Sequence, residues 1–229
     1  MKMVGLVGGV SWLSTIEYYR LINEGVNRKL GGLSSAQCVI YSLNFAEVAP
    51  VVTGRNWDRF FEIIGTAVDK CRDAGAEAIV LCANTPHLLA ERLEESFGLP
   101  VIHIAEATAR ELDRAGITKA LLLGTRATME MDFFRSRLVR HNIDAVVPLE
   151  ADREFINASI FGELGRGEFR PETKARYLDI IESFAAGGGE GVILGCTEIP
   201  LLVKQGDCSI PVFDTAAIHA AAAVEFALS

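Results

Sequence analysis

Two segments of the chain resemble each other and decide the fold: Gly75-Ala-Glu-Ala-Ile-Val-Leu-Cys-Ala-Asn-Thr-Pro-His-Leu-Leu89 and, 113 residues later, Gly188-Gly-Glu-Gly-Val-Ile-Leu-Gly-Cys-Thr-Glu-Ile-Pro-Leu-Leu202. A second match follows them, because Leu99-Pro-Val-Ile-His103 resembles Ile210-Pro-Val-Phe-Asp214 at a spacing of 111. The openings Lys2–Gly9 and Lys119–Thr125 also correspond. Gly-rich strand ends are common to many α/β units, but three matches in one order indicate two related halves.

Short apolar runs alternate with amphipathic stretches along the chain. The runs that predict strands are 3–8, 38–43, 78–82, 100–104, 119–123, 145–148, 191–195 and 211–213. Between them, apolar residues recur at helical spacing, for example over 60–72 and 173–186. Unbroken apolar strands that alternate with helices are typical of parallel sheets covered by helices on both faces.

These patterns predict an α/β fold of two similar lobes. We expect each lobe to be a parallel four-stranded sheet flanked by helices. We expect a pseudo-twofold axis to relate the lobes, with the functional site between them, because ligands of parallel sheets bind beyond the carboxyl ends of the strands. The predicted boundaries are 1–99 plus 208–229 for the first lobe and 100–207 for the second.

The composition excludes several classes of protein. The 229 residues are 50% hydrophobic and 23% charged, with a net charge of −8 and no cluster of Lys or Arg. A nucleic-acid or anionic-membrane partner therefore has no electrostatic footprint. No apolar run approaches the roughly 18 residues that a membrane span needs. The start of the chain does not read as a secretory leader, so we expect a cytoplasmic protein.

Five widely spaced cysteines do not form a disulfide framework, and there is no Cys-x-x-Cys. Cys38 and Cys71 fall in a strand and on an apolar helix face, so we expect them in the core. We expect Cys208 to be an exposed, inert thiol. The spacing of Cys82, His87, Cys196 and Glu198 is weak as a metal motif, so we predict no metal site.

Cys82 and Cys196 are different, because each follows the corresponding buried strand of its half. Inverting a carbon centre requires removal of a proton from one face and delivery of a proton to the other. Thiols suit this chemistry, since their pKa of about 8.5 is close enough to neutrality to be tuned. Four polar residues beside these thiols are candidates to hold a carboxylate substrate: Asn84, Thr85, Thr197 and Glu198.

The same residues carry a resemblance to a known family. The segments around Cys82 and Cys196 resemble the two signature motifs of the aspartate/glutamate racemases, and Gly8-Gly-Val-Ser-Trp-Leu-Ser-Thr15 is similar to that family's opening motif. The likeness continues through Gly124–Thr125 and Val212–His219. It implies two α/β lobes with an interlobe site, an amino-acid substrate, no pyridoxal phosphate, no metal, no other cofactor and a homodimer.

The resemblance also implies roles for individual residues. Cys82 and Cys196 become the two catalytic acid/base groups. The candidate substrate-binding residues are Val10, Ser11, Val52, Ala83, Asn84, Thr85, Thr125, Thr197 and Glu198. Residues expected behind them are His87, His103 and Asp214. A solvated helix position is an equal alternative for His87, and hydrogen-bonded burial is an equal alternative for His103 and Asp214.

The chain departs from the family pattern at three places. Val10 replaces the usual Met, and Ala83 stands where some relatives have a Thr that is credited with a catalytic part. The expected loop 44–55, where relatives place groups for an acidic side chain, offers one basic residue, Arg55. If Arg55 faces solvent, Arg166 or Lys174 of the second half is the next candidate.

Three hypotheses for the function follow. The first is a racemase for aspartate or glutamate that uses two cysteines. The second is a related isomerase of maleate type, in which one cysteine is a nucleophile. The third is a non-catalytic protein that binds amino acids and needs neither thiol.

Overall fold

The computed structural model describes residues 1–229, which divide into two compact units. Unit 1 contains Met1–His103 and His219–Ser229, and unit 2 contains Ile104–Ile218. The chain returns to unit 1 at His219, which is later than the predicted boundary at 208. Strand β7 (Val212–Asp214) pairs with β6 (Gly191–Gly195) of unit 2. This pairing keeps residues 208–218 in unit 2.

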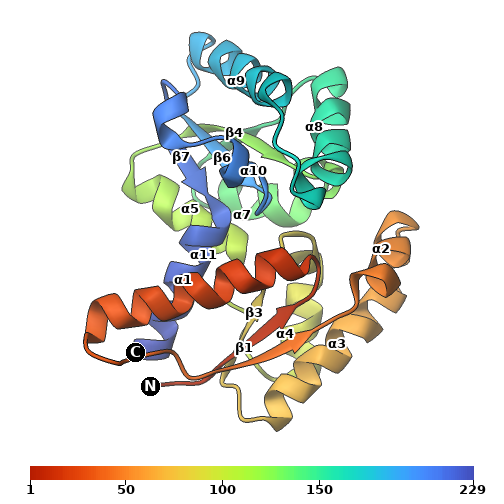
Figure 1. Ribbon diagram of the computed structural model, residues 1–229, viewed down its shortest axis with the longest axis vertical. Coiled ribbons are helices and arrows are strands. Elements are labelled where there is room, and N and C mark those ends of the chain that lie inside the picture. Colours follow the sequence, from red (N-terminus) through yellow and green to blue (C-terminus); the bar gives the residue numbers. More distant parts are fainter. The chain divides into compact units, whose positions relative to one another are not determined.

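Unit 1 is built on a three-stranded parallel sheet. Its central strand β1 (Val4–Gly8) lies between β2 (Cys38–Ser42) and β3 (Ala78–Leu81), as Figure 1 shows. The fourth strand predicted over 100–104 is wrong, since only Val101 forms a bridge, with Ile79. The extended segment is too short for a strand because helix α5 already begins at Ile104.

The helices of unit 1 cover this sheet. They are α1 (Trp12–Leu30), α2 (Phe45–Thr53), α3 (Trp57–Asp73), the 3₁₀ helix η1 (Thr85–Leu89), α4 (Ala90–Phe97) and most of α11 (Thr215–Leu228). The loop expected at 44–55 is wrong, because most of it is helix α2. The Asn44 side chain caps that helix by accepting a hydrogen bond from the Ala46 N–H, and Val48 is buried.

Unit 2 has the expected four-stranded parallel sheet, in the order β5-β4-β6-β7, with β4 (Lys119–Gly124) and β5 (Asp144–Val146). The helices on one face are α8 (Glu150–Gly162) and α9 (Pro171–Ala186), and those on the other are α5 (Ile104–Arg114) and α7 (Asp132–Arg140). The remaining short helices are α6 (Arg126–Glu130), η2 (Leu164–Arg166), α10 (Ile199–Leu202) and η3 (Gln205–Asp207). No helix of either unit has the length and apolar character of a membrane span.

Both central strands end in a glycine that a threonine covers. A Cβ on Gly8 would lie 2.4 Å from the Thr15 side chain, and one on Gly124 would lie 3.1 Å from that of Thr128. In unit 1 the Thr15 hydroxyl also accepts a hydrogen bond from the Gly9 N–H at 2.8 Å. These contacts fix the backbone just beyond β1 and β4.

Gly9 supports a prediction about stability. Its φ is +85°, and a Cβ there would lie 2.1 Å from the Leu43 carbonyl oxygen. Gly98 is a matched control, since its φ is +67° but a Cβ would meet nothing within 4 Å. Gly98→Ala should lose ~1 kcal/mol for the left-handed backbone alone. Gly9→Ala should lose ~1–3 kcal/mol more from overpacking, measured by urea unfolding. Equal losses of unfolding free energy in the two variants would show that the loop after β1 shifts at no cost to make room for the Cβ.

Candidate functional site

The carboxyl end of β6 brings three predicted site residues together in unit 2. Cys196 directly follows β6 and is 9% exposed, and Glu198 is 7% exposed. The Cys196 thiol donates a hydrogen bond to Glu198 Oε2 at 2.9 Å, and the Thr197 hydroxyl donates to the same oxygen at 2.8 Å. A buried carboxylate therefore holds the proton of a buried thiol.

This environment favours the protonated form of Cys196. Burial raises the pKa of the Cys196 thiol well above its usual value, and the charge of Glu198 and the hydrogen bond to it raise it further. Any step that needs the thiolate must pass the proton to an acceptor. Glu198 is the carboxylate in contact with it.

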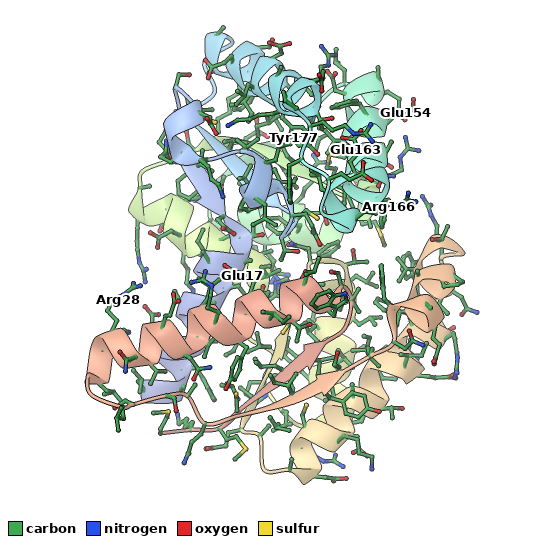
Figure 2. All side chains as sticks on the ribbon, viewed as in Figure 1. Glu17, Arg28, Glu154, Glu163, Arg166 and Tyr177 are labelled. Atoms are coloured by element: carbon green, nitrogen blue, oxygen red, sulfur yellow. The ribbon has the colours of Figure 1, made fainter.

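Packing and hydrogen bonds fix the position of this pair. Cys196 belongs to the apolar cluster beneath α8 and α9, together with Tyr177 (Figure 2). The Tyr177 hydroxyl is within 3.0 Å of Ser159 Oγ on α8. The Thr215 hydroxyl donates to the Leu194 carbonyl at 2.9 Å and so anchors β6 two residues before the thiol.

Cys82 directly follows β3 in unit 1 and is 2% exposed. Its N–H donates to the Val7 carbonyl at 2.9 Å, which continues the sheet ladder beyond β3. Its thiol lies 3.7 Å from the carbonyl oxygen of Val80. Burial raises the pKa of the Cys82 thiol far above its usual value, and Cys71 and Cys38 raise it further.

His87 is hydrogen-bonded to the backbone that follows Cys82. Its Nδ1 lies 2.9 Å from the carbonyl oxygen of Ala83 and 3.2 Å from that of Asn84. Because both partners are acceptors, Nδ1 must carry the proton. The buried His87 ring also packs edge-on against His103 at a centroid distance of 5.0 Å. The structure therefore gives His87 a supporting position and places His103 beside it.

His219 and Tyr18 complete this cluster. His219 Nε2 faces the Ile102 carbonyl at 2.5 Å, so Nε2 carries the proton and Nδ1 accepts from the Tyr18 hydroxyl at 2.8 Å. The His219 ring packs against His87 at 5.1 Å. Burial lowers the pKa of His219 well below its usual value, and the neighbouring His87 lowers it further, against the opposing effect of the Ile102 hydrogen bond. His219 is thus a neutral imidazole with one fixed tautomer.

The other predicted site residues lie at or near strand ends of their own units. Val10 and Ser11 follow β1, and Thr125 follows β4, where its hydroxyl lies 3.2 Å from Thr128 Oγ1. Ala83 and Thr85 are half-buried beyond β3. Val52 belongs to α2 and packs on the core of unit 1. Asp214 ends β7 and caps α11, since its carboxylate accepts from the Ala216 N–H at 2.9 Å.

The basic residues that were candidates to bind a substrate side chain do not lie among the buried site residues described above. Arg55 is exposed, with an unusual φ of +53°. Arg166 is exposed at the end of η2 (Figure 2). Lys174 pairs with Asp207 at 2.7 Å.

The thiols predicted to be inert are placed almost as expected. Cys71 is buried on the inner face of α3, and Cys38 is half-buried in β2. Cys208 is half-buried rather than exposed, because it packs against the core of unit 2. No group of three His, Cys, Asp or Glu side chains lies close enough together to hold a metal ion.

Sequence reasoning missed the residues that support the site from behind. Thr15, Tyr18, Thr128, Tyr177 and Thr215 were not identified, although each makes a buried contact described above. Thr15 and Tyr18 follow the Gly-rich opening at helical spacing, which was the available signal. Tyr177 was recognised only as an apolar helix position.

The neutral state of His219 predicts a pH dependence of stability. In the unfolded chain a histidine takes up a proton near pH 6.5, but folded His219, surrounded by Tyr18, His87 and the Ile102 carbonyl, does not. The stability that neutral His219 supplies is therefore complete above about pH 6.5 and is lost as the pH falls below it. His219→Gln should remove ~1.4 kcal/mol of that loss per pH unit, measured by urea unfolding at pH 7.5 and 5.5. The same pH slope in both proteins would contradict a buried neutral histidine.

Comparisons with known proteins agree with this architecture. A solved structure of a candidate Asp/Glu racemase from Yersinia pestis is 46% identical, with all of both chains covered and a TM-score of 0.94. The structure of an aspartate racemase homologue from Pyrococcus horikoshii is 37% identical, again over all of both chains, with a TM-score of 0.85. The broad specificity amino-acid racemase RacX of Bacillus subtilis is 21% identical over 97% of this chain and 96% of its own. Racemases are isomerases, and the model of the Asp/Glu/Hydantoin racemase family matches residues 7–223. The chain therefore belongs to the Asp/Glu/Hydantoin racemase family.

Proposed function

We propose that this chain is an amino-acid racemase in which Cys196 moves the α-proton and Glu198 exchanges that proton with the thiol. The observation that carries the proposal is the buried thiol–carboxylate contact of 2.9 Å at the end of β6. The racemases among the relatives, including one with broad amino-acid specificity, support the reaction class.

The first step would transfer the Cys196 proton to Glu198. The positive α-ammonium group of a bound amino acid would favour the thiolate, because an opposite charge within about 4–6 Å lowers a thiol's pKa. The thiolate would then remove the α-proton. The electron pair left on the α-carbon would be shared with the substrate carboxylate, which backbone N–H groups and hydroxyls beyond the strand ends can stabilise.

Racemisation is completed when a proton reaches the opposite face of the α-carbon. We infer that this second proton is supplied at the strand end of unit 1 that carries Asn84 and Thr85. The His87–His219–Tyr18 cluster would hold this strand end in place, because His87 is hydrogen-bonded to the backbone at Ala83 and Asn84. In the two-cysteine hypothesis Cys82 supplies the proton on this side.

Thiol acid/base chemistry needs neither pyridoxal phosphate nor a metal, so we propose a cofactor-independent enzyme. Within this proposal aspartate and glutamate are the first substrates to test, because relatives are described as racemases of those amino acids. We also propose a cytoplasmic homodimer, as the family resemblance implies.

The first prediction here concerns the thiol–carboxylate pair. In deuterated water, Cys196→Ser should slow exchange of the substrate α-proton by ~10²–10⁴-fold, because a positioned acid/base group contributes that much. Glu198→Gln keeps the shape but removes the proton acceptor, so it should lower kcat more than it raises KM. Both rates are measured by proton NMR, with thermal melts as the check on folding. Cys208→Ser is the control for a thiol of unit 2 outside the pair, and it should keep the wild-type rate.

The same variants separate the other hypotheses. A nucleophilic cysteine of the maleate-isomerase type would leave a covalent adduct of substrate mass on Cys196 during turnover. A non-catalytic binding protein would show ligand-dependent stabilisation in thermal melts and no α-proton exchange. Either result would replace the racemase proposal.

The second prediction concerns the substrate side chain. Arg55 is exposed, and the neighbouring Val52 packs on the core, so α2 presents no buried cation. We expect Arg55→Ala to lower kcat/KM for aspartate and homoserine by the same factor, within about twofold, since a bidentate Arg–carboxylate pair would favour only the charged substrate. A selective loss for aspartate would show instead that Arg55 reads the carboxylate.

A further inference from the structure

The two units differ at the residue that would perform proton transfer. This inference rests on the proposed function and concerns the face of the substrate opposite Cys196. The two-cysteine hypothesis assumes that Cys82 and Cys196 hold equivalent places, but three observations show that they do not.

The first observation is the spacing of the repeat. Ala78, the first residue of β3, and Gly191, the first residue of β6, are 113 residues apart, as are the segments that contain them. The same spacing aligns Cys196 with Ala83 and aligns Cys82 with Gly195.

The second observation is the register of the two sheets. Gly124 ends β4 and lies opposite Gly195 in the ladder. Gly8 ends β1 in the same way, and the next rung after Val7–Leu81 places Cys82 opposite it. The Cys82 N–H bond to Val7 confirms that the ladder extends that far. Gly8 and Gly124 are equivalent, because a threonine from the following helix covers each of them. Cys82 therefore occupies the rung of Gly195.

The third observation is the face to which each side chain belongs. Val192, Leu194 and Cys196 share one apolar cluster, whereas Ile193 belongs to the cluster on the other side of the sheet. In unit 1, Ile79 and Leu81 share the cluster beneath α3. Side chains alternate along a strand, so the face of Leu81 continues to Ala83. Cys82 belongs to the face of Val80, whose carbonyl its thiol contacts.

We infer that Ala83 takes in unit 1 the position that Cys196 takes in unit 2, and that Cys82 is not the second acid/base group. The three equivalent residues are then Ala83, Asn84 and Thr85 in place of Cys196, Thr197 and Glu198. Unit 1 thus lacks both the thiol and the carboxylate. Proton transfer to the second face of the α-carbon then uses solvent water as the donor, without a matched side chain, and this step limits racemisation.

This arrangement separates two rates that a two-thiol enzyme couples. Cys196 can remove the α-proton of one enantiomer and return a solvent deuteron to the same face, which is exchange with retention. Conversion to the other enantiomer also needs proton transfer at the opposite face of the α-carbon. In deuterated water we expect one enantiomer of aspartate to exchange its α-proton ~10²-fold or more faster than it converts. Proton NMR and chiral chromatography measure the two rates separately.

Substitutions test which residue of unit 1 matters. Cys82→Ser should keep both rates within about twofold. Ala83→Cys should raise conversion ~10-fold or more toward the rate of exchange, because it adds a thiol at the matched position. Ala83→Cys combined with Thr85→Glu should raise conversion further, since it reproduces the pair of unit 2. Ala83→Val is the control for a larger side chain without a proton to transfer, and it should raise neither rate.

A readout that does not depend on turnover accompanies these rates. Iodoacetamide labelling is quantified for each cysteine by peptide mass spectrometry, with and without aspartate. Aspartate should protect Cys196, and the new thiol in Ala83→Cys, but not Cys82. Protection of Cys82, or loss of conversion in a folded Cys82→Ser protein, would overturn the inference and leave the proposed function standing. No α-proton exchange by the wild-type protein with any amino acid would overturn the proposed function itself.

Discussion

The parallel ladder between each central strand and its neighbour is the constraint on which the candidate site depends. Backbone pairing of β1 with β3, and of β4 with β6, sets which residue stands at each strand end and on which face it lies. Side chains alternate between faces, so a shift of one residue sends a thiol to the opposite side of the sheet. The glycines that end β1 and β4, covered by Thr15 and Thr128, hold the last rungs in place. The register of the ladder therefore decides which face of the sheet each thiol occupies, and so which groups it can contact.

The two strand ends use their polar groups differently. In unit 2, Glu198 accepts hydrogen bonds from two neighbouring side chains, Cys196 and Thr197. In unit 1, His87 and His219 direct their N–H groups to backbone carbonyls, and the tautomers are fixed by those acceptors. These hydrogen bonds hold the backbone of unit 1 in place. One unit pairs a thiol with a carboxylate, and the other directs its imidazole N–H groups to the backbone.

Much of this organisation could be predicted from the sequence. Continuous apolar runs separated by helical periodicity are sufficient to predict two parallel sheets, and the repeat identifies Cys196 with Thr197 and Glu198. The weaker predictions involve segments whose structure depends on tertiary packing. The segment after β2 became helix α2 because Val48 is buried and Asn44 caps the chain. The fourth strand of unit 1 was reduced to one bridge because α5 starts immediately after it.

His87 and His103 were predicted to lie behind the site, but their cluster with Tyr18 and His219 was beyond prediction for a different reason. Its members are far apart in sequence, and a histidine on an apolar face gives no sign of its partner. The hydrogen bond from Tyr18 to His219 joins residues 201 positions apart. Only the packing of α11 against α1 and η1 brings these side chains together. The sequence does contain the position of Cys82, because the repeat offset of 113 residues aligns it with Gly195 and not with Cys196.

Most of helix α11 belongs to unit 1 but is synthesised after unit 2, so the order of synthesis affects folding. Unit 1 contains the first residues of the chain but also needs His219–Ser229, which are made after all of unit 2. Until then the Tyr18 hydroxyl and the Ile102 carbonyl lack the imidazole that pairs with both. The Lys2 N–H likewise lacks the Ala227 carbonyl, which lies 2.8 Å away in the folded unit. On a ribosome, unit 2 can therefore finish folding first, although its sequence begins later. Unit 1 can complete its packing only after the C-terminal helix has been made.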